Sequence, residues 1–227
     1  MSVGAPADIP MVNPGKERVG KDRQEREPLP DKAAGMVAEA NPVSKAGIPE
    51  RYRSVAPDFK SFEIIQRTGR GLYLQGPNGT GKTQAASAIA LAFVEKGKSV
   101  HFTSGGKLLS KLRDAMRSDE SEAEVFAELT MPDLLVIDDL GKENQTPWAV
   151  SMIYMAIDDR YNTRKPVVIT SNYSKRELVA RLSTAADSST AEAIVSRLFE
   201  MTAKIEMGGE DRRLVRSWNA FSELTRT

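Results

Sequence analysis

A short glycine-rich stretch constrains this chain more than any other feature. Residues 76–83 read Gly-Pro-Asn-Gly-Thr-Gly-Lys-Thr, which is the G-x-x-x-x-G-K-T pattern of a phosphate-binding P-loop. The apolar segment 71–75 before it predicts a short buried strand, and the alanine-rich segment 84–93 after it predicts a helix. Because the pattern requires this order of strand, loop and helix, the sequence predicts a nucleotide-binding α/β domain.

Each residue type in the loop has a chemical reason. Glycines at 76, 79 and 81 tolerate positive φ and let backbone N–H groups turn toward a ligand. The free N–H groups and the dipole at the start of the helix favour a polyphosphate. Lys82 can reach the β- and γ-phosphates, and the Thr83 hydroxyl can ligate Mg²⁺. The loop therefore predicts a nucleotide bound together with Mg²⁺.

Length and composition narrow the remaining possibilities. A chain of 227 residues has room for one full α/β core. It has no cysteine and only one histidine, His101, which excludes disulfides and metal clusters built from thiolates or several histidines. The net charge of +1 means that any surface for DNA must be local. No apolar stretch approaches membrane-spanning length, so we expect a soluble cytoplasmic protein with no membrane partner.

The amino-terminal part differs in composition from the rest. Residues 1–46 are rich in proline, glycine and mixed charge, which predicts a mostly disordered arm, either a docking tail or simply a flexible terminus. Order is expected from about residue 47. The aromatic and aliphatic residues between there and the P-loop strand predict either an adenine pocket or ordinary core, and we keep both interpretations.

A second landmark ends a strongly apolar run. Residues 133–141 read Asp-Leu-Leu-Val-Ile-Asp-Asp-Leu-Gly, which predicts a strand buried on both faces of a parallel sheet. Its carboxyl end, where ligands bind in open α/β sheets, carries Asp138 and Asp139. Asp138 is typical of an aspartate that holds Mg²⁺ through water, and Asp139 of a carboxylate that orients and polarises the attacking water.

Two further segments carry candidate residues. Segment 166–172 predicts another buried strand, and Asn172 at its tip either holds the lytic water, senses the γ-phosphate or only turns the chain; its place at the carboxyl edge favours a functional role. Segment 106–117 predicts a helix with one leucine-rich face. Its other side carries four cations, interpreted either as a solvated surface or as a contact for a phosphate backbone: Lys107, Lys111, Arg113 and Arg117.

In this order, the segments resemble the AAA+ ATPases of the DnaC/DnaI helicase-loader and IstB-like group. The resemblance runs from about Gly47 to Arg213 and is carried by the P-loop together with six short motifs: Gly47–Tyr52, Phe102–Ser104, Leu134–Gly141, Asp159–Tyr161, Ile169–Asn172 and Ser196–Leu198.

The resemblance implies a three-layer αβα P-loop NTPase fold with parallel sheet order 5-1-4-3-2 and ATP at subunit boundaries, with residues 47–227 as the AAA+ domain. Asp138 and Asp139 would be the Walker-B pair, Asn172 sensor 1, and Arg197 an arginine finger that reaches a neighbour's site. The nucleotide would contact the following residues: Gly76, Pro77, Asn78, Gly79, Thr80, Gly81, Lys82, Thr83, Gln84 and Arg213.

The function that this resemblance implies is an ATP-dependent loader of a replicative, hexameric DnaB-type helicase, bacterial or phage-encoded. Loaders of this group self-assemble and grip single-stranded DNA where the helix around Lys107 to Arg117 lies. Asp139 replaces the glutamate common in AAA+ proteins, which predicts slow hydrolysis suited to a switch. The alternatives are an IstB-like transposition helper that acts on duplex DNA and a nucleotide-locked structural adaptor that barely hydrolyses ATP.

Overall fold

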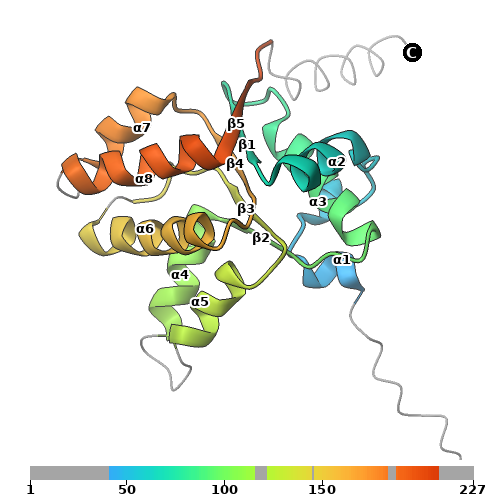
Figure 1. Cartoon of the computed structure of the whole chain (residues 1–227), viewed down its shortest axis with the longest axis horizontal. Helices are drawn as coiled ribbons and strands as arrows, with labels where there is room; N and C mark the ends of the chain where they lie inside the picture. The colour runs from blue at the N-terminus through green and yellow to red at the C-terminus, as the bar shows by residue number, and fades with distance from the viewer. Residues whose placement is uncertain (1–40, 116–121, 145, 184–187, 210–227) are drawn as a thin grey trace, which may run out of the picture. The chain divides into compact units, whose positions relative to one another are not determined.

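The computed structural model describes residues 41–115, 122–144, 146–183 and 188–209, all within one compact unit, Ala40–Thr227 (Figure 1). None of the described helices is both long and apolar enough to cross a lipid bilayer. The elements follow in this order: α1 Pro42–Lys45, η1 Glu50–Tyr52, α2 Phe59–Thr68, β1 Gly71–Gln75, α3 Lys82–Glu95, β2 Val100–Ser104, α4 Gly105–Ala115, α5 Glu122–Thr130, β3 Leu134–Asp138, α6 Pro147–Asn162, β4 Val167–Ser171, α7 Lys175–Leu182, α8 Ser188–Met201 and β5 Thr202–Glu206.

The five strands form one parallel sheet in the order β2-β3-β4-β1-β5. Read from the other edge, this is the predicted order 5-1-4-3-2, so the prediction is confirmed. The central strands β3 and β4 are buried almost throughout, which explains their uninterrupted apolar sequences.

The strands divide their side chains between two apolar cores. On one face, Tyr73, Ile137 and Ile169 pack with α4, α5, α6, α7 and α8. On the other face, Leu74 and Val136 pack with α2 and α3, and α1 lies on this side too (Figure 1). Because side chains alternate along a strand, one set of short strands supplies both cores, and the result is a three-layer αβα arrangement.

Local signals place the helices that surround the site. Ser174 and Glu177 form a capping box at the start of α7, as the sequence predicted for Ser174. The hydroxyl of Thr146 caps α6. The start of α3 has no side-chain cap and Gly81 occupies its N-cap position, so the first backbone N–H groups of this helix stay available to a ligand.

Part of the segment that was expected to be an arm is helical. Pro42–Lys45, inside the segment expected to be an arm, form helix α1, and Ala46 is buried. The backbone N–H of Phe102, the third residue of β2, donates to the Ala46 carbonyl at 2.7 Å. This contact is tertiary, so the local composition did not signal it. Residues 1–40 of the predicted arm lie outside the described residues.

Candidate nucleotide site

The predicted P-loop residues, the two aspartates and Asn172 gather at one edge of the sheet because three neighbouring strands end there. β1 leads into the P-loop, β3 ends at Asp138, and β4 ends just before Asn172. The register pairs Gln75 with Ser171 and Ser104 with Asp138, so these strand ends are level with one another. Parallel strands bring their carboxyl ends to the same edge, where ligands bind in open α/β folds.

The P-loop is shaped by glycines in the left-handed region. Gly79 has φ 81° and Gly81 has φ 94°, values that favour glycine over any residue with a Cβ atom. The Lys82 ammonium lies along the loop and donates to the carbonyls of Gly76 and Pro77, both at 2.7 Å. With only 5% of its surface exposed, Lys82 is held against the loop that would cradle the phosphates.

Asp138 is the most strongly held acidic group of the site. The Thr83 hydroxyl lies 3.0 Å from Oδ1 and 3.2 Å from Oδ2 of Asp138, and the Thr170 hydroxyl donates to Oδ1 at 2.6 Å. Burial raises the pKa of Asp138, while the hydrogen bond from Thr170 opposes the increase. The charge of Asp139 adds to the increase, and the Thr83 hydroxyl and Lys142 oppose it.

Asp139 is adjacent in sequence but has a different environment. Its backbone adopts φ 58°, a left-handed conformation that is uncommon without glycine. The backbone N–H of Asp139 donates to the Thr170 hydroxyl at 2.8 Å, which helps to hold this strained turn. Its carboxylate is partly exposed and accepts a 2.7 Å ion-pair contact from the Lys142 ammonium. Asp139 therefore faces the pocket, whereas Asp138 is anchored in the sheet edge.

The side-chain oxygen of Asn78 links three segments through the hydrogen bonds that it accepts. It accepts from Lys142 Nζ at 3.1 Å and from Asn172 Nδ2 at 2.9 Å. The P-loop, the turn after β3 and the tip of β4 are thus linked through one acceptor. The Asn172 Oδ1 atom is buried and has no hydrogen-bond partner among the described residues, so an acceptor remains available there.

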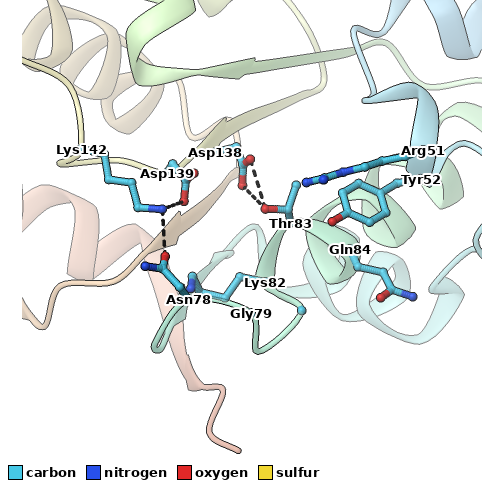
Figure 2. A pocket seen from close by; sticks show the side chains of 11 residues that line it. Arg51, Tyr52, Asn78, Gly79, Lys82, Thr83, Gln84, Asp138, Asp139 and Lys142 are labelled. Atoms are coloured by element: carbon cyan, nitrogen blue, oxygen red, sulfur yellow. Dashed lines mark hydrogen bonds and ion pairs between the residues drawn. The ribbon is translucent and has the colours of Figure 1, made fainter. Parts of the chain in front are cut away.

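The P-loop residues, both aspartates and Lys142 line one pocket with two chemically different ends, and Asn172 and Thr170 are not among its lining residues (Figure 2). Arg51, Tyr52 and Gln84 lie at one end, and the Arg51 guanidinium stands 4.6 Å from the centre of the Tyr52 ring. At the other end are Lys142 and Asn78, with Asp139 beside them. Of the two interpretations of the segment before β1, Arg51 and Tyr52 support the pocket lining, whereas Ile48 and Ile65 are buried core.

Arg197 lies away from this pocket, on α8. Its guanidinium pairs with Asp158 at 2.8 Å and stands 5.1 Å and 5.9 Å from the ring centres of Tyr154 and Tyr161, which are on α6. The structure therefore does not bring Arg197 together with the P-loop of its own chain. Arg213 lies outside the described residues.

The cations of α4 also lie outside the pocket. Lys107 is exposed, Lys111 pairs with Glu128 of α5, and the Arg113 guanidinium stands 5.6 Å from the centre of the Trp148 ring. The buried face of α4 carries Leu108, Leu109 and Leu112, as its periodicity predicted. Arg117 lies outside the described residues.

Sequence reasoning missed two residues of the site. Thr170 holds both aspartates, and its signals were its place near the end of an apolar strand and within the motif Ile169–Asn172, neither of which assigned it a role. Lys142 had no signal at all, because its partners Asp139 and Asn78 come together only in the fold.

A parallel sheet in this order, with a P-loop after β1 and paired aspartates at the end of β3, defines a P-loop nucleotide-binding domain of the AAA+ type. The model of the IstB-like ATP binding protein family matches residues 45–220, and the chain belongs to this family. The resemblance seen in the sequence is thereby confirmed.

The relatives are of two kinds, insertion-sequence ATP-binding proteins and replicative helicase loaders. The chain is 30% identical over 145 residues to an insertion-sequence ATP-binding protein of Mycobacterium tuberculosis, covering 64% of this chain and 56% of that protein. It is also 30% identical over 167 residues to the replicative helicase loader DnaI of Bacillus subtilis, covering 71% and 53%. The chain thus spans little more than half the length of these relatives. A crystal structure of DnaI shares the fold, with a TM-score of 0.61 at 22% identity over 70% of this chain and 94% of that one.

Proposed function

We propose that this protein is an ATP-hydrolysing switch that loads a replicative DnaB-type helicase onto single-stranded DNA. One observation carries the ATP part: the P-loop residues Lys82 and Thr83 meet the Asp138 carboxylate at one sheet edge, within one pocket. Such a pocket combines a cation for the phosphates, backbone N–H groups at a helix start and hard oxygen ligands for a metal. We place its activity in the cytoplasm, where replicating DNA is available.

The two ends of the pocket suggest the orientation of ATP. The P-loop fixes the phosphates, and the aromatic ring of Tyr52 with Arg51 offers a flat, partly apolar surface for the base. The terminal phosphate would then lie toward Asp139 and Lys142, which are at the opposite end (Figure 2).

The donor set at Thr83 and Asp138 fits Mg²⁺. A hydroxyl and a carboxylate at 3.0 Å are hard oxygen ligands, which Mg²⁺ prefers together with water and phosphate oxygens. Because burial raises the pKa of Asp138, a nearby cation would also relieve the cost of its charge. When bound, Mg²⁺ would neutralise phosphate charge and make the terminal phosphoryl group easier to transfer.

Asp139 and Asn172 are the proposed hydrolytic residues. Asp139 faces the pocket with a partly exposed carboxylate, which can orient an attacking water and accept its proton. The buried, unpartnered Oδ1 atom of Asn172 can accept the other hydrogen of that water. This complete set supports a hydrolase over the nucleotide-locked adaptor, and a phosphate-release assay separates the two.

The test of this chemistry compares ATP turnover in the unaltered protein with Lys82→Ala and Asp139→Ala, with and without single-stranded DNA. Lys82→Ala should lose both nucleotide binding and turnover, whereas Asp139→Ala should keep binding and lose at least about tenfold in turnover. Lys60→Ala, on the exposed surface of α2, is the matched control and should change neither. Unchanged turnover in both site variants would remove these roles.

Helicase loading is proposed because a named helicase loader, DnaI, is among the relatives that match most of the described domain. We further propose that subunits assemble through the α6–α8 side of the domain, with Arg197 acting on a neighbour's nucleotide and Arg213 acting at the nucleotide too. Asp158, Tyr154 and Tyr161 hold the Arg197 guanidinium in a fixed position. Mixtures of Arg197→Ala and Lys82→Ala subunits should recover some turnover, and no recovery would argue against action between subunits.

Single-stranded DNA is proposed to contact α4 through Lys107, Lys111, Arg113 and Arg117. Among the described cations, Lys107 is exposed and lies at the start of α4, whereas Lys111 is already paired with Glu128. Lys107→Glu should therefore weaken binding more than Lys111→Glu, and should reduce the salt slope by roughly 0.7 per lost phosphate contact. A salt slope that stays the same in both variants contradicts this surface.

An insertion-sequence role is the second candidate, because the matching family model is IstB-like and a relative belongs to an insertion sequence. The same ATP switch would then serve a transposase on duplex DNA. Affinity purification from the native host separates the candidates: a hexameric helicase supports loading, and a transposase supports the alternative. A preference for duplex over single-stranded DNA would also support the insertion-sequence role.

A further inference from the structure

Lys142 lies at one end of the pocket and contacts two of its segments. It follows the β3 strand by four residues, and its ammonium contacts Asp139 Oδ1 at 2.7 Å and Asn78 Oδ1 at 3.1 Å. It therefore bridges the turn that carries the second aspartate to the P-loop. Figure 2 shows this bridge at the end of the pocket opposite Arg51 and Tyr52.

The bridge is weak enough to exchange partners. The side chains of Lys142 and Asp139 are 36% and 39% exposed, and ion pairs exposed to this degree contribute at most about 1 kcal/mol. A triphosphate carries more negative charge than one carboxylate and offers several acceptor oxygens. Its terminal phosphate can therefore displace Asp139 as the partner of the Lys142 ammonium.

The two lysines of the pocket have different settings. Lys82 is buried and held on the P-loop carbonyls of Gly76 and Pro77, where both a diphosphate and a triphosphate would meet it. Lys142 approaches from the other side, beside the two aspartates. A third phosphate would extend the ligand toward this end of the pocket, away from Arg51 and Tyr52.

Building on the proposed ATP switch, we propose that Lys142 reads the third phosphate and makes the site selective for a nucleoside triphosphate over a diphosphate. Without the third phosphate, the ammonium rests on Asp139 and Asn78. With it, Lys142 contacts the terminal phosphate, Asp139 is released to act on water, and the Asn78 oxygen keeps its hydrogen bond from Asn172. Lys142 thus links the presence of the substrate to the release of the hydrolytic carboxylate.

The test measures two affinities by fluorescence titration, one for a labelled ADP and one for a labelled, non-hydrolysable ATP analogue, both with Mg²⁺. Lys142→Met should bind the ATP analogue about tenfold more weakly, the effect of one lost contact to a charged group, and should bind ADP within about twofold of the unaltered protein. Lys142→Arg, which keeps the charge, should restore most of the selectivity. Lys60→Met controls for the loss of one surface lysine.

The resting contact can be tested separately. Asp139→Asn removes the competing carboxylate, so the affinity for the ATP analogue should rise while that for ADP stays the same. Equal losses of both affinities in Lys142→Met, or no loss of either, would overturn the role of Lys142. If instead the unaltered protein binds neither nucleotide, or if Lys82→Ala binds both normally, the proposed ATP site fails and the role of Lys142 fails with it.

Discussion

Polar groups at the carboxyl ends of the strands, the carboxyl edge, are arranged differently from those at the amino ends, the amino edge. At the carboxyl edge, Asp139 and Lys142 are partly exposed and line a pocket, and Asn172 keeps an acceptor with no partner among the described residues. At the amino edge, the guanidinium of Arg160 is fully buried and donates to backbone carbonyls of its own domain. The carboxyl edge thus offers polar groups to a ligand, whereas at the amino edge Arg160 bonds to carbonyls of the protein itself.

Arg160 is the centre of the amino edge. From the last turn of α6 it donates to the carbonyls of Leu129 and Pro132 at 3.0 Å, and to the carbonyl of Pro166 at 2.7 Å. These carbonyls precede β3 and β4, so the guanidinium fastens the starts of the two central strands. Burial lowers the pKa of Arg160 to about 10, which leaves it charged at neutral pH.

The difference shows how to distinguish a structural polar network from a functional one. The two terminal nitrogens of the Arg160 guanidinium donate to carbonyls of the same domain, and only Nε lacks a partner among the described residues, so most of this buried group is satisfied without a ligand. A group of polar side chains from several elements that leaves acceptors and charges directed into a pocket is a candidate site. Both networks place charged side chains beside the ends of β3 and β4, so residue type alone does not separate them.

The largest expected effect is on stability at the amino edge. Arg160→Met should lower the free energy of unfolding by about 3 kcal/mol or more, because several buried carbonyls lose their donor. Arg160→Lys, which keeps the charge but reaches fewer carbonyls, should lose less. Urea unfolding measures both. A decrease below about 1 kcal/mol in Arg160→Met would contradict the structural role.

One threonine substitution at each edge compares the two edges directly. Thr170→Val removes the hydroxyl that holds both aspartates, whereas Thr202→Val removes a buried hydroxyl that donates to Leu198 at the amino edge. Each should cost about 1 kcal/mol of unfolding free energy. Only Thr170→Val should also lower ATP turnover, by about tenfold. Equal turnover in the two variants would break the distinction.

The smallest expected effect is a gain in stability instead of a loss. Because the pKa of Asp138 is raised in the folded protein, its ionised form costs stability at pH values above that pKa. Asp138→Asn should therefore raise the melting temperature at pH 7 by about 1–3 °C, without nucleotide or Mg²⁺.

The pH dependence checks the cause of that gain. As pH falls through the raised pKa, the wild-type carboxyl becomes protonated, so the advantage of Asp138→Asn should shrink. Melting scans of both proteins from pH 7 down to pH 4 measure this advantage. An advantage for Asp138→Asn that persists at low pH would mean that burial of charge is not its source.

Much of this fold could be predicted from local patterns. The P-loop, the apolar strands before Asp138 and Asn172, and the cap at Ser174 each depend on short stretches of sequence. The network around Asn78 could not be predicted, because its donors come from residues 64 and 94 positions away. The same holds for Ala46, which is buried and whose carbonyl accepts a hydrogen bond from Phe102, 56 positions away.

What the sequence by itself determined is the class of the domain and the positions of its P-loop and paired aspartates, because glycine spacing and apolar periodicity act over a few residues. Only the tertiary structure decided that Lys142 pairs with Asp139 and that Arg160 lies buried. Pairing and burial depend on which strand ends are neighbours in the sheet, and that is a property of the whole chain.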